Sequence, residues 1–331
     1  MRFRSRVRTP RNRLMLLTVM CMFVNLFAGV VEADIASAAG SDPGRTDYSV
    51  FGDQIVWMEK DAKGIKQVHT LNQTSGAAKI LTSSSSAKDA PAVGGGFVVW
   101  ADKSSEEESS LNWDIYSSNI SIGSPTKLNQ TSGQYGNPST DGVGVVWYER
   151  THYGNMIYHG LASGVEAELG EGRFPVLANG IVVYKNARSG GLSMLNLSSG
   201  ATRSIVRLGG ANFVDWFVFN GSHVLWKQKN GASESKYVLM SIKDFTLSPM
   251  DLTAMNISNT DYAFMAIGAG QAVFQVEVNG APVLKNVNLL SRSVTSLPAL
   301  PSGAKLIGIS GEKLLYSIND QYIEAVQLDV D

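Results

Sequence analysis

Cysteine is almost absent from this 331-residue chain, because Cys21 is the only one. It lies within an apolar N-terminal segment, so the rest of the chain holds no thiol and no disulfide. Charged residues are also few, at 17%, and there are only four histidines. A chain so poor in cysteine and histidine has little from which to build a zinc or transition-metal site.

Sequence motifs of catalysis are missing as well. The nucleophile elbow G-x-S-x-G does not occur, because Gly308 to Gly311 is followed by Glu312 rather than completing the pattern. The chain also lacks H-E-x-x-H, a P-loop and a calcium-binding loop. The histidines are isolated from one another: His69, His152, His159 and His223. We therefore predict that the chain is not an enzyme and binds no cofactor and no metal.

A basic stripe that would bind nucleic acid is missing too. Six arginines lie within the first thirteen residues, and the chain from residue 39 onward has 22 basic and 27 acidic side chains. Binding to phosphates requires clustered lysine and arginine, so nucleic acid is excluded as a partner.

The N-terminus has the three-part layout of a secretory signal. Arginines in residues 1–13 precede an apolar run over residues 14–31, and small residues follow up to Ala33 and Ala38. We predict a signal peptide over residues 1–33. The alternative is a retained anchor, because eighteen apolar residues approach the length that spans a bilayer. Either way the body is exported to the periplasm, the cell surface or the extracellular space, and touches the membrane only through this segment.

What the chain does have is a repeat of the form Gly-x-x-Val-Val-Trp. It occurs seven times, in strict or looser copies, at intervals of 37 to 48 residues, and its copies end at Trp57, Trp100, Trp147, Tyr184, Trp226, Phe274 and Tyr316. A glycine turn before a β-branched run, repeated at about this period, is typical of the four-stranded blades of a propeller. We predict an all-β fold over residues 47–331: a seven-bladed β-propeller of four-stranded antiparallel blades.

The seventh unit stops after its third strand, near Gln327. An open propeller would expose strand edges on its first and last blades, which proteins avoid. We therefore predict that residues 34–46 form an N-terminal closing segment, in which residues 34–39 supply the missing outer strand.

The repeat units resemble those of TolB-type β-propellers, found in exported bacterial and archaeal proteins. The second unit carries the pattern best, with Pro91, the run Val98 to Trp100 and the segment Asp114 to Tyr116; the third repeats it as NPSTDGVGVVWYE. The resemblance covers almost the whole chain after about residue 47. It implies an exported scaffold that binds other molecules across one face or the central channel, and it carries over no specific binding residue.

Two loops between second and third strands are longer than the others. Lys103 to Asn112 contains three consecutive glutamates and reads as a solvated loop. Glu149 to Asn155 mixes charged and aromatic residues, which is typical of a contact surface. Four tryptophans share one repeat position and are predicted to pack between blades, namely Trp57, Trp100, Trp147 and Trp226. Trp113 and Trp216 lie off that position and are predicted to be surface aromatics. The candidate partner-binding residues are Glu149, Arg150, His152, Tyr153, Trp113 and Trp216.

These observations predict an exported, non-catalytic propeller that serves as a scaffold for a protein or cell-envelope partner. One alternative is a glycan-binding propeller, or a metal-dependent glycan lyase in which histidines of different blades hold the metal. Another is a structural component of the cell surface.

Overall fold

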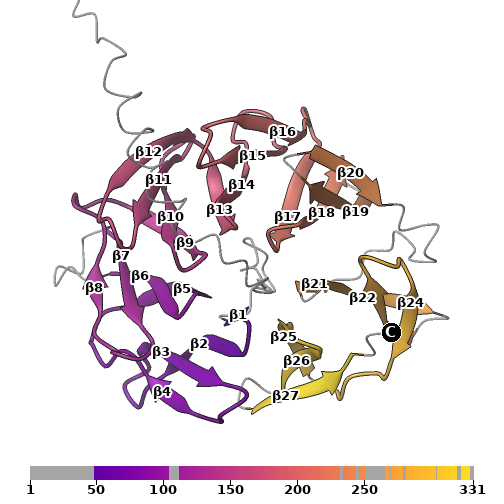
Figure 1. The fold of residues 1–331 in the computed structure, drawn as a ribbon, viewed down its shortest axis with the longest axis horizontal. Helices are drawn as coiled ribbons and strands as arrows, with labels where there is room; N and C mark the ends of the chain where they lie inside the picture. Colours follow the sequence, from indigo (N-terminus) through magenta and orange to yellow (C-terminus); the bar gives the residue numbers. More distant parts are fainter. Residues whose placement is uncertain are drawn as a thin grey trace, which may run out of the picture.

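The structure is a computed structural model that describes residues 48–103, 112–231, 234–243, 246–250, 265–268, 270–278, 281–302, 304–318 and 322–328. Strands arranged as sheets around a central axis make up this part of the chain, as Figure 1 shows. Within these ranges, no helix has the length and apolar character needed to cross a membrane. The predicted signal peptide and closing segment lie outside the described residues.

Seven sheets follow one another along the chain. The bounds of the strands, blade by blade, are β1 (Tyr48–Phe51), β2 (Gln54–Lys60), β3 (Lys66–Asn72), β4 (Ala78–Ile80); β5 (Lys88–Gly94), β6 (Phe97–Asp102), β7 (Asp114–Asn119), β8 (Thr126–Lys127); β9 (Tyr135–Thr140), β10 (Gly144–Glu149), β11 (Asn155–Gly160), β12 (Glu166–Glu171); β13 (Arg173–Ala178), β14 (Ile181–Lys185), β15 (Leu192–Asn196), β16 (Thr202–Val206); β17 (Phe213–Phe219), β18 (His223–Asn230), β19 (Glu234–Lys243), β20 (Thr246–Met250); β21 (Met265–Gly268), β22 (Gln271–Val278), β23 (Ala281–Asn288), β24 (Val294–Leu297); β25 (Ala304–Ser310), β26 (Lys313–Ile318), β27 (Tyr322–Gln327).

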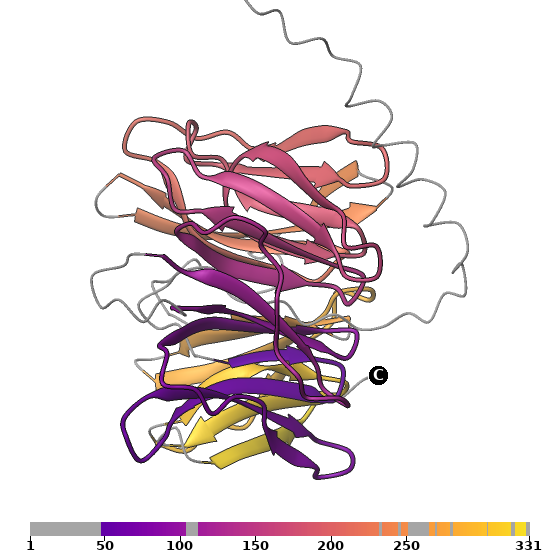
Figure 2. The same ribbon diagram turned by 90° about the vertical axis from the view of Figure 1, so that its left-hand side faces the viewer.

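Each blade is an antiparallel meander whose first strand is innermost (Figures 1 and 2). Six sheets have four strands, and the described part of the seventh has three, in the order β25-β26-β27. The predicted fold class, a seven-bladed all-β propeller, is confirmed.

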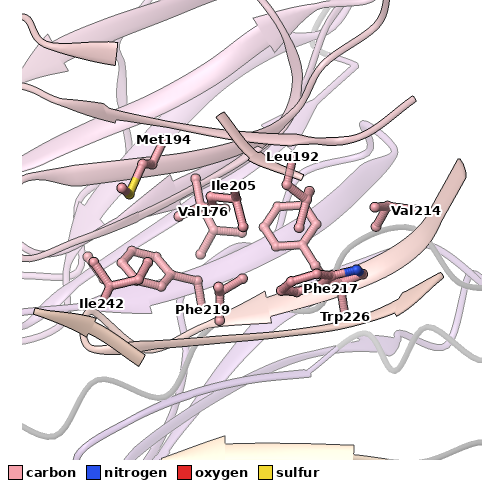
Figure 3. Close-up of a cluster of buried hydrophobic side chains, with 12 residues drawn as sticks. Val176, Leu192, Met194, Ile205, Val214, Phe217, Phe219, Trp226 and Ile242 are labelled. Atoms are coloured by element: carbon pink, nitrogen blue, oxygen red, sulfur yellow. The ribbon is translucent and has the colours of Figure 1, made fainter. Parts of the chain in front are cut away.

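The repeated aromatic position is the core between blades, as predicted. Trp100, Trp147 and Trp226 are at most 1% exposed. Alternation of side chains along each strand sends one set toward the preceding blade and the other toward the next. Figure 3 shows one such layer, where Trp226 and Phe217 of the fifth blade pack against Val176 and other residues of the fourth. The prediction is less accurate for Trp57, which is only partly buried.

The ring closes between the seventh and first blades. Ile307 and Leu315 pack with Val50 and Ile55 in one buried cluster. The Ser310 hydroxyl also donates a hydrogen bond of 2.5 Å to the backbone carbonyl of Gly52. Packing of side chains therefore joins the two ends of the array.

Inner strands of the second, third and fourth blades share a β-bulge next to a proline. In β13 the pairing with β14 shifts between Arg173 and Val176, and Phe174, just before Pro175, has φ of 52°. Ala90 and Asn137 hold the same place in β5 and β9, each before a proline and each with positive φ. Proline lacks the backbone donor, so it suits the strand edge that faces the channel. The bulge changes the direction in which the first residue of each of these three strands points.

Candidate functional site

One face of the propeller gathers the longer loops. In an antiparallel meander, the loop between the second and third strands lies at the same end as the connection to the next blade. We call this end of the propeller the loop face, and the opposite end the turn face. Each inner strand begins at the loop face, so the starts of β5, β9 and β13 lie at this end of the propeller, on the side of their sheets nearest the axis (Figure 1).

The loop of residues 149–155, between β10 and β11, is held by its own backbone and by its neighbours. The Arg150 amide donates to the carbonyl of Gln134 at 2.7 Å, and the Gly154 amide donates to Thr151 at 3.3 Å. On the other side, the Gly172 amide donates to the Gly154 carbonyl at 3.3 Å. These bonds fix the loop before any partner arrives, which lowers the entropic cost of binding.

Arg150 extends from this loop across the start of the inner strand. Its Nη2 lies 3.4 Å from Asp89 Oδ2, and its guanidinium lies over the Trp113 ring at 5.4 Å from the ring centre. A Cβ on Gly136 would come within 2.4 Å of Arg150 Nε, so a glycine at the start of β9 leaves the room for this side chain. Arg150 thereby links the second blade to the third.

Tyr153 presents an exposed aromatic ring beside a second arginine. Tyr153 is 41% exposed. Its ring centre lies 4.5 Å from that of the His152 ring and 4.5 Å from the Arg188 guanidinium. Arg188 also binds Glu171 through two hydrogen bonds of 2.6 Å. These bonds lower the pKa of the Glu171 carboxyl and raise the pKa of Arg188. The bidentate pair holds the Arg188 guanidinium over the tyrosine ring.

Arg173 is the first residue of β13 and lies behind the same loop. Its Nη2 donates to the backbone carbonyls of Thr151, at 2.7 Å, and of His152. Its Nε is buried and has no hydrogen-bond partner. Arg173 therefore holds the loop of residues 149–155 against the start of β13, while its buried Nε is left without a partner.

Five of the six predicted binding residues meet on the loop face, and one does not. Glu149, Arg150, His152 and Tyr153 share the loop, and Trp113 lies under Arg150. The expectation for Trp216 is wrong: it is 6% exposed and packs against Tyr237, because β17 begins at Phe213 and places Trp216 within the core between blades five and six. Trp113 is partly buried. Of the acidic insertion, residues 104–111 lie outside the described ranges.

Sequence reasoning missed several residues of this site. Asp89, Arg173 and Arg188 were not singled out, although Asp89 and Arg173 each stand two positions before a repeated proline. That register was a usable signal, because equivalent positions of successive blades lie at the same height around the axis. Arg188 and Glu171 carry no such mark.

The histidines do not form a metal site in the described part of the chain, where no group of three or more histidine, cysteine, aspartate or glutamate side chains could hold an ion. Burial lowers the pKa of His69, His159 and His223. For His69 and His159 a nearby glutamate partly offsets that effect. Each histidine belongs to the packing or loops of its own blade.

No protein-family model and no curated protein sequence matches the chain. Solved structures do match. A prolyl endopeptidase is similar with a TM-score of 0.59 and 12% identity, over 97% of this chain and 56% of the other. The β-propeller domain of the Trilobed protease from Pyrococcus furiosus gives 0.57 and 11%, over 90% and 96%. An acylaminoacyl peptidase from Pyrococcus horikoshii gives 0.54 and 10%, over 85% and 48%. The chain thus spans about half the length of the two whole peptidases.

TolB from Acinetobacter baumannii is also among the matches, with a TM-score of 0.45 and 12% identity over 88% of this chain and 71% of the other. The fold that the resemblance to TolB-type propellers implied, a seven-bladed β-propeller, is confirmed.

These matches correct the predicted function. The matched structures with TM-scores above 0.5 include three peptidases and the propeller domain of a protease, so the prediction of a non-catalytic scaffold for a protein or envelope partner is wrong. The two alternatives, a glycan-active propeller and a structural component of the cell surface, have no support among these matches and are rejected together with that prediction. The error has a physical reason: repeats determine how blades pack, whereas the bound molecule depends on loops that differ between propellers. At 10–12% identity, these matches show a likeness of fold alone.

Proposed function

We propose that this propeller binds peptide segments on its loop face, as the substrate-handling part of a peptidase system. The observation that carries the proposal is the fixed loop of residues 149–155 on the loop face, where Arg150 lies over Trp113 and Tyr153 lies under Arg188. The peptidase propellers of similar fold support it, since by their names those proteins act on peptides.

The chemistry of the loop face suits an extended peptide. Exposed tyrosine and arginine side chains supply large contact areas and planar donors, and both are enriched where proteins bind proteins. The inner strands are also edge strands of their sheets, and a peptide backbone can add hydrogen bonds to such an edge.

An array of overlapping peptides from a denatured protein tests the proposal. The purified chain is expected to retain a subset of them, and Tyr153→Ala is expected to reduce retention by about tenfold, the effect of losing one well-placed aromatic contact. Mass spectrometry should recover the retained peptides uncut.

A matched control comes from the turn face. Leu290, between β23 and β24, is 93% exposed, so Leu290→Ser removes an exposed apolar side chain far along the chain from the site. Retention by Leu290→Ser should equal that of the wild type. Absence of retained peptides, or equal losses in the two variants, would refute peptide binding at this loop.

We also propose that the chain is exported. The arginines of residues 1–13, the apolar run of residues 14–31 and the small residues near Ala33 support a cleaved signal. Sequencing the N-terminus of the protein from each cell fraction checks this. A mature protein that starts at Asp34 outside the cytoplasm is expected, and a cytoplasmic protein that starts at Met1 would contradict it.

A further inference from the structure

Resting on the proposed peptide function, we propose that Phe213 is a second aromatic contact for the bound peptide, so that the site selects segments with two apolar side chains. Phe213 begins β17, the inner strand of the fifth blade, and therefore lies on the loop face. The described residues with an exposed phenylalanine, tyrosine or tryptophan side chain are Phe213, at 42%, and Tyr153, at 41%. Both belong to the loop face.

One short loop connects the two rings. It comprises residues 186–191, between β14 and β15 of the fourth blade. On one side, the Arg188 guanidinium lies 4.5 Å from the centre of the Tyr153 ring. On the other side, a Cβ on Gly190 would lie 3.3 Å from Phe213 Cβ. Since residues 188 and 190 are at most about 7 Å apart along the chain, the two rings flank the same loop.

Hydrogen bonds fix the shape of this loop and tie it to β17. Asn186 Oδ1 accepts from the amides of Arg188 and Ser189, each at 3.0 Å. The Gly190 amide donates to the Asn186 carbonyl at 3.0 Å, and the Gly190 carbonyl accepts from the Val214 amide at 2.8 Å. The arrangement of the two rings is therefore set before a peptide arrives, which lowers the entropic cost of binding both.

Packing of the core does not account for Phe213. Tyr135, which begins β9 of the third blade, is 4% exposed and packs against Trp147 with 6.3 Å between ring centres. Phe213, by contrast, belongs to none of the buried clusters of the described residues. A single exposed apolar side chain is common on protein surfaces, whereas exposed aromatic rings gathered on one face are typical of a binding surface.

The charges beside the two rings are balanced within the protein. Arg188 is held by Glu171 through two hydrogen bonds of 2.6 Å. Lys229, which lies opposite Phe213 in the neighbouring strand, has its Nζ 3.7 Å from Asp215 Oδ2. An acidic side chain of a peptide would thus meet cations that are already neutralised, whereas an apolar side chain gains free energy by covering a ring. The surface therefore favours apolar side chains over acidic ones.

Fluorescence anisotropy with four kinds of fluorescein-labelled decapeptide tests the proposal. A background of serine and glycine carries two phenylalanines, one phenylalanine, none, or two glutamates in place of the phenylalanines. The pair is placed two to six residues apart, which covers about 7 to 20 Å in an extended chain. At the best spacing, the peptide with two phenylalanines should bind about tenfold more tightly than the peptide with one. The glutamate peptide should bind no better than the peptide that has neither residue.

The variant Phe213→Ser should remove the difference between the peptides with one and two phenylalanines. Phe213→Leu should retain most of it, because leucine also presents an apolar side chain. Leu290→Ser, on the turn face, is the matched control and should bind both peptides as the wild type does.

If Phe213→Ser does not fold, photo-crosslinking to the wild type decides. Two versions of the peptide with two phenylalanines carry benzoylphenylalanine at the first or at the second position. Between them they should label the chain beside Phe213 as well as beside Tyr153, and mass spectrometry of the digested protein locates the labels.

Failure of this proposal is distinguishable from failure of peptide binding itself. The second contact is overturned, while peptide binding stands, if one and two phenylalanines bind equally at every spacing or if the glutamate peptide binds as tightly as they do. It is also overturned if Phe213→Ser folds and changes nothing, or if no label lies beside Phe213. If none of these decapeptides binds but the array of overlapping peptides retains some, the second contact alone is refuted. If the array also retains none, the proposed function is refuted with it.

Discussion

Lys88 is a buried charge that the protein itself satisfies. Its side chain is fully buried, and Nζ donates to Ser84 Oγ at 2.6 Å and to the Ser86 carbonyl at 2.8 Å, with Asp102 Oδ2 at 3.9 Å. Burial lowers the pKa of Lys88, and Asp102 opposes that shift. Lys88 thus clamps the connection between the first two blades, in contrast to Arg173, whose buried donor has no partner.

His159 makes the free energy of unfolding depend on pH. It lies on β11 near the Trp147 ring, at 6.4 Å, opposite Glu166, and its Nδ1 is buried without a hydrogen bond. Burial is the main cause that lowers its pKa below 6.5, and Glu166 partly opposes it. Below pH 6.5 the unfolded chain therefore takes up a proton before the folded one does.

We expect the free energy of unfolding to fall as the pH drops below 6.5, and to stop falling from this cause once the pH is below the folded pKa. One proton contributes at most about 1.4 kcal/mol per pH unit. In His159→Gln, the free energy of unfolding should change less steeply with pH between pH 6.5 and 5 than it does in the wild type. Above pH 7 the two proteins should show the same dependence on pH. Urea unfolding at a series of pH values measures this, and equal slopes would contradict it.

At the scale of elements, neighbouring turns touch through backbone. The turn before β10 approaches the turn before β6 so closely that a Cβ on Gly142 would lie 2.4 Å from the Cα of Gly95. Gly142 also has φ of 86°. The left-handed backbone and the contact with Gly95 thus each require glycine at position 142. Together they explain only part of the glycine turn that opens each repeat unit.

Gly142→Ala should therefore destabilise the propeller more than an alanine in an open turn. Gly96 is the control, because its φ of 81° is similar and a Cβ there would meet nothing within 4 Å. Gly96→Ala should cost about 1–2 kcal/mol for the left-handed backbone alone, and Gly142→Ala about 1–3 kcal/mol more for the displaced backbone. The midpoints of urea unfolding measure both losses of stability. Equal losses in the two variants would mean that the second and third blades can move apart at this contact.

At the scale of the whole molecule, closure of the ring involves both side-chain packing and strand count. The described part of the seventh sheet ends with β27, whose outer edge has no strand beside it there. Elsewhere the outer strand of one blade leads to the next inner strand across a short connection, as from Ile80 to Lys88 and from Lys127 to Tyr135. The same spacing counted back from Tyr48 reaches Gly40, next to the segment predicted to close the ring.

A protein that begins at Asp34 should accordingly be more stable than one that begins at Asp42, since only the first retains residues 34–39. Loss of an outer strand exposes the edge of β27, so we expect a lower midpoint of thermal unfolding together with concentration-dependent association. A synthetic peptide of residues 34–46 should restore the midpoint of the shorter protein. Identical midpoints without the peptide would refute the closing strand.

Much of the fold could be predicted because its information is local and repeated. The glycine, the β-branched run and the final aromatic recur at one position in each unit, so the repeat alone places Trp100, Trp147 and Trp226 between blades. Trp216 was misplaced because β17 begins before the residue where the pattern indicated a strand. The loop at Glu149 to Asn155 was recognised from its length and composition, whereas Arg188 and Glu171 carry no repeat signal.

The sequence by itself therefore determined the architecture: each blade leaves two apolar faces, and only stacking seven of them around an axis buries both. Tertiary structure alone decided the site. Which arginine finds a carboxylate, as Arg188 does, and which keeps a buried donor without a partner, as Arg173 does, depends on distances between segments that are remote in the chain. Those distances follow from side-chain packing and backbone bulges, which a repeat pattern does not encode.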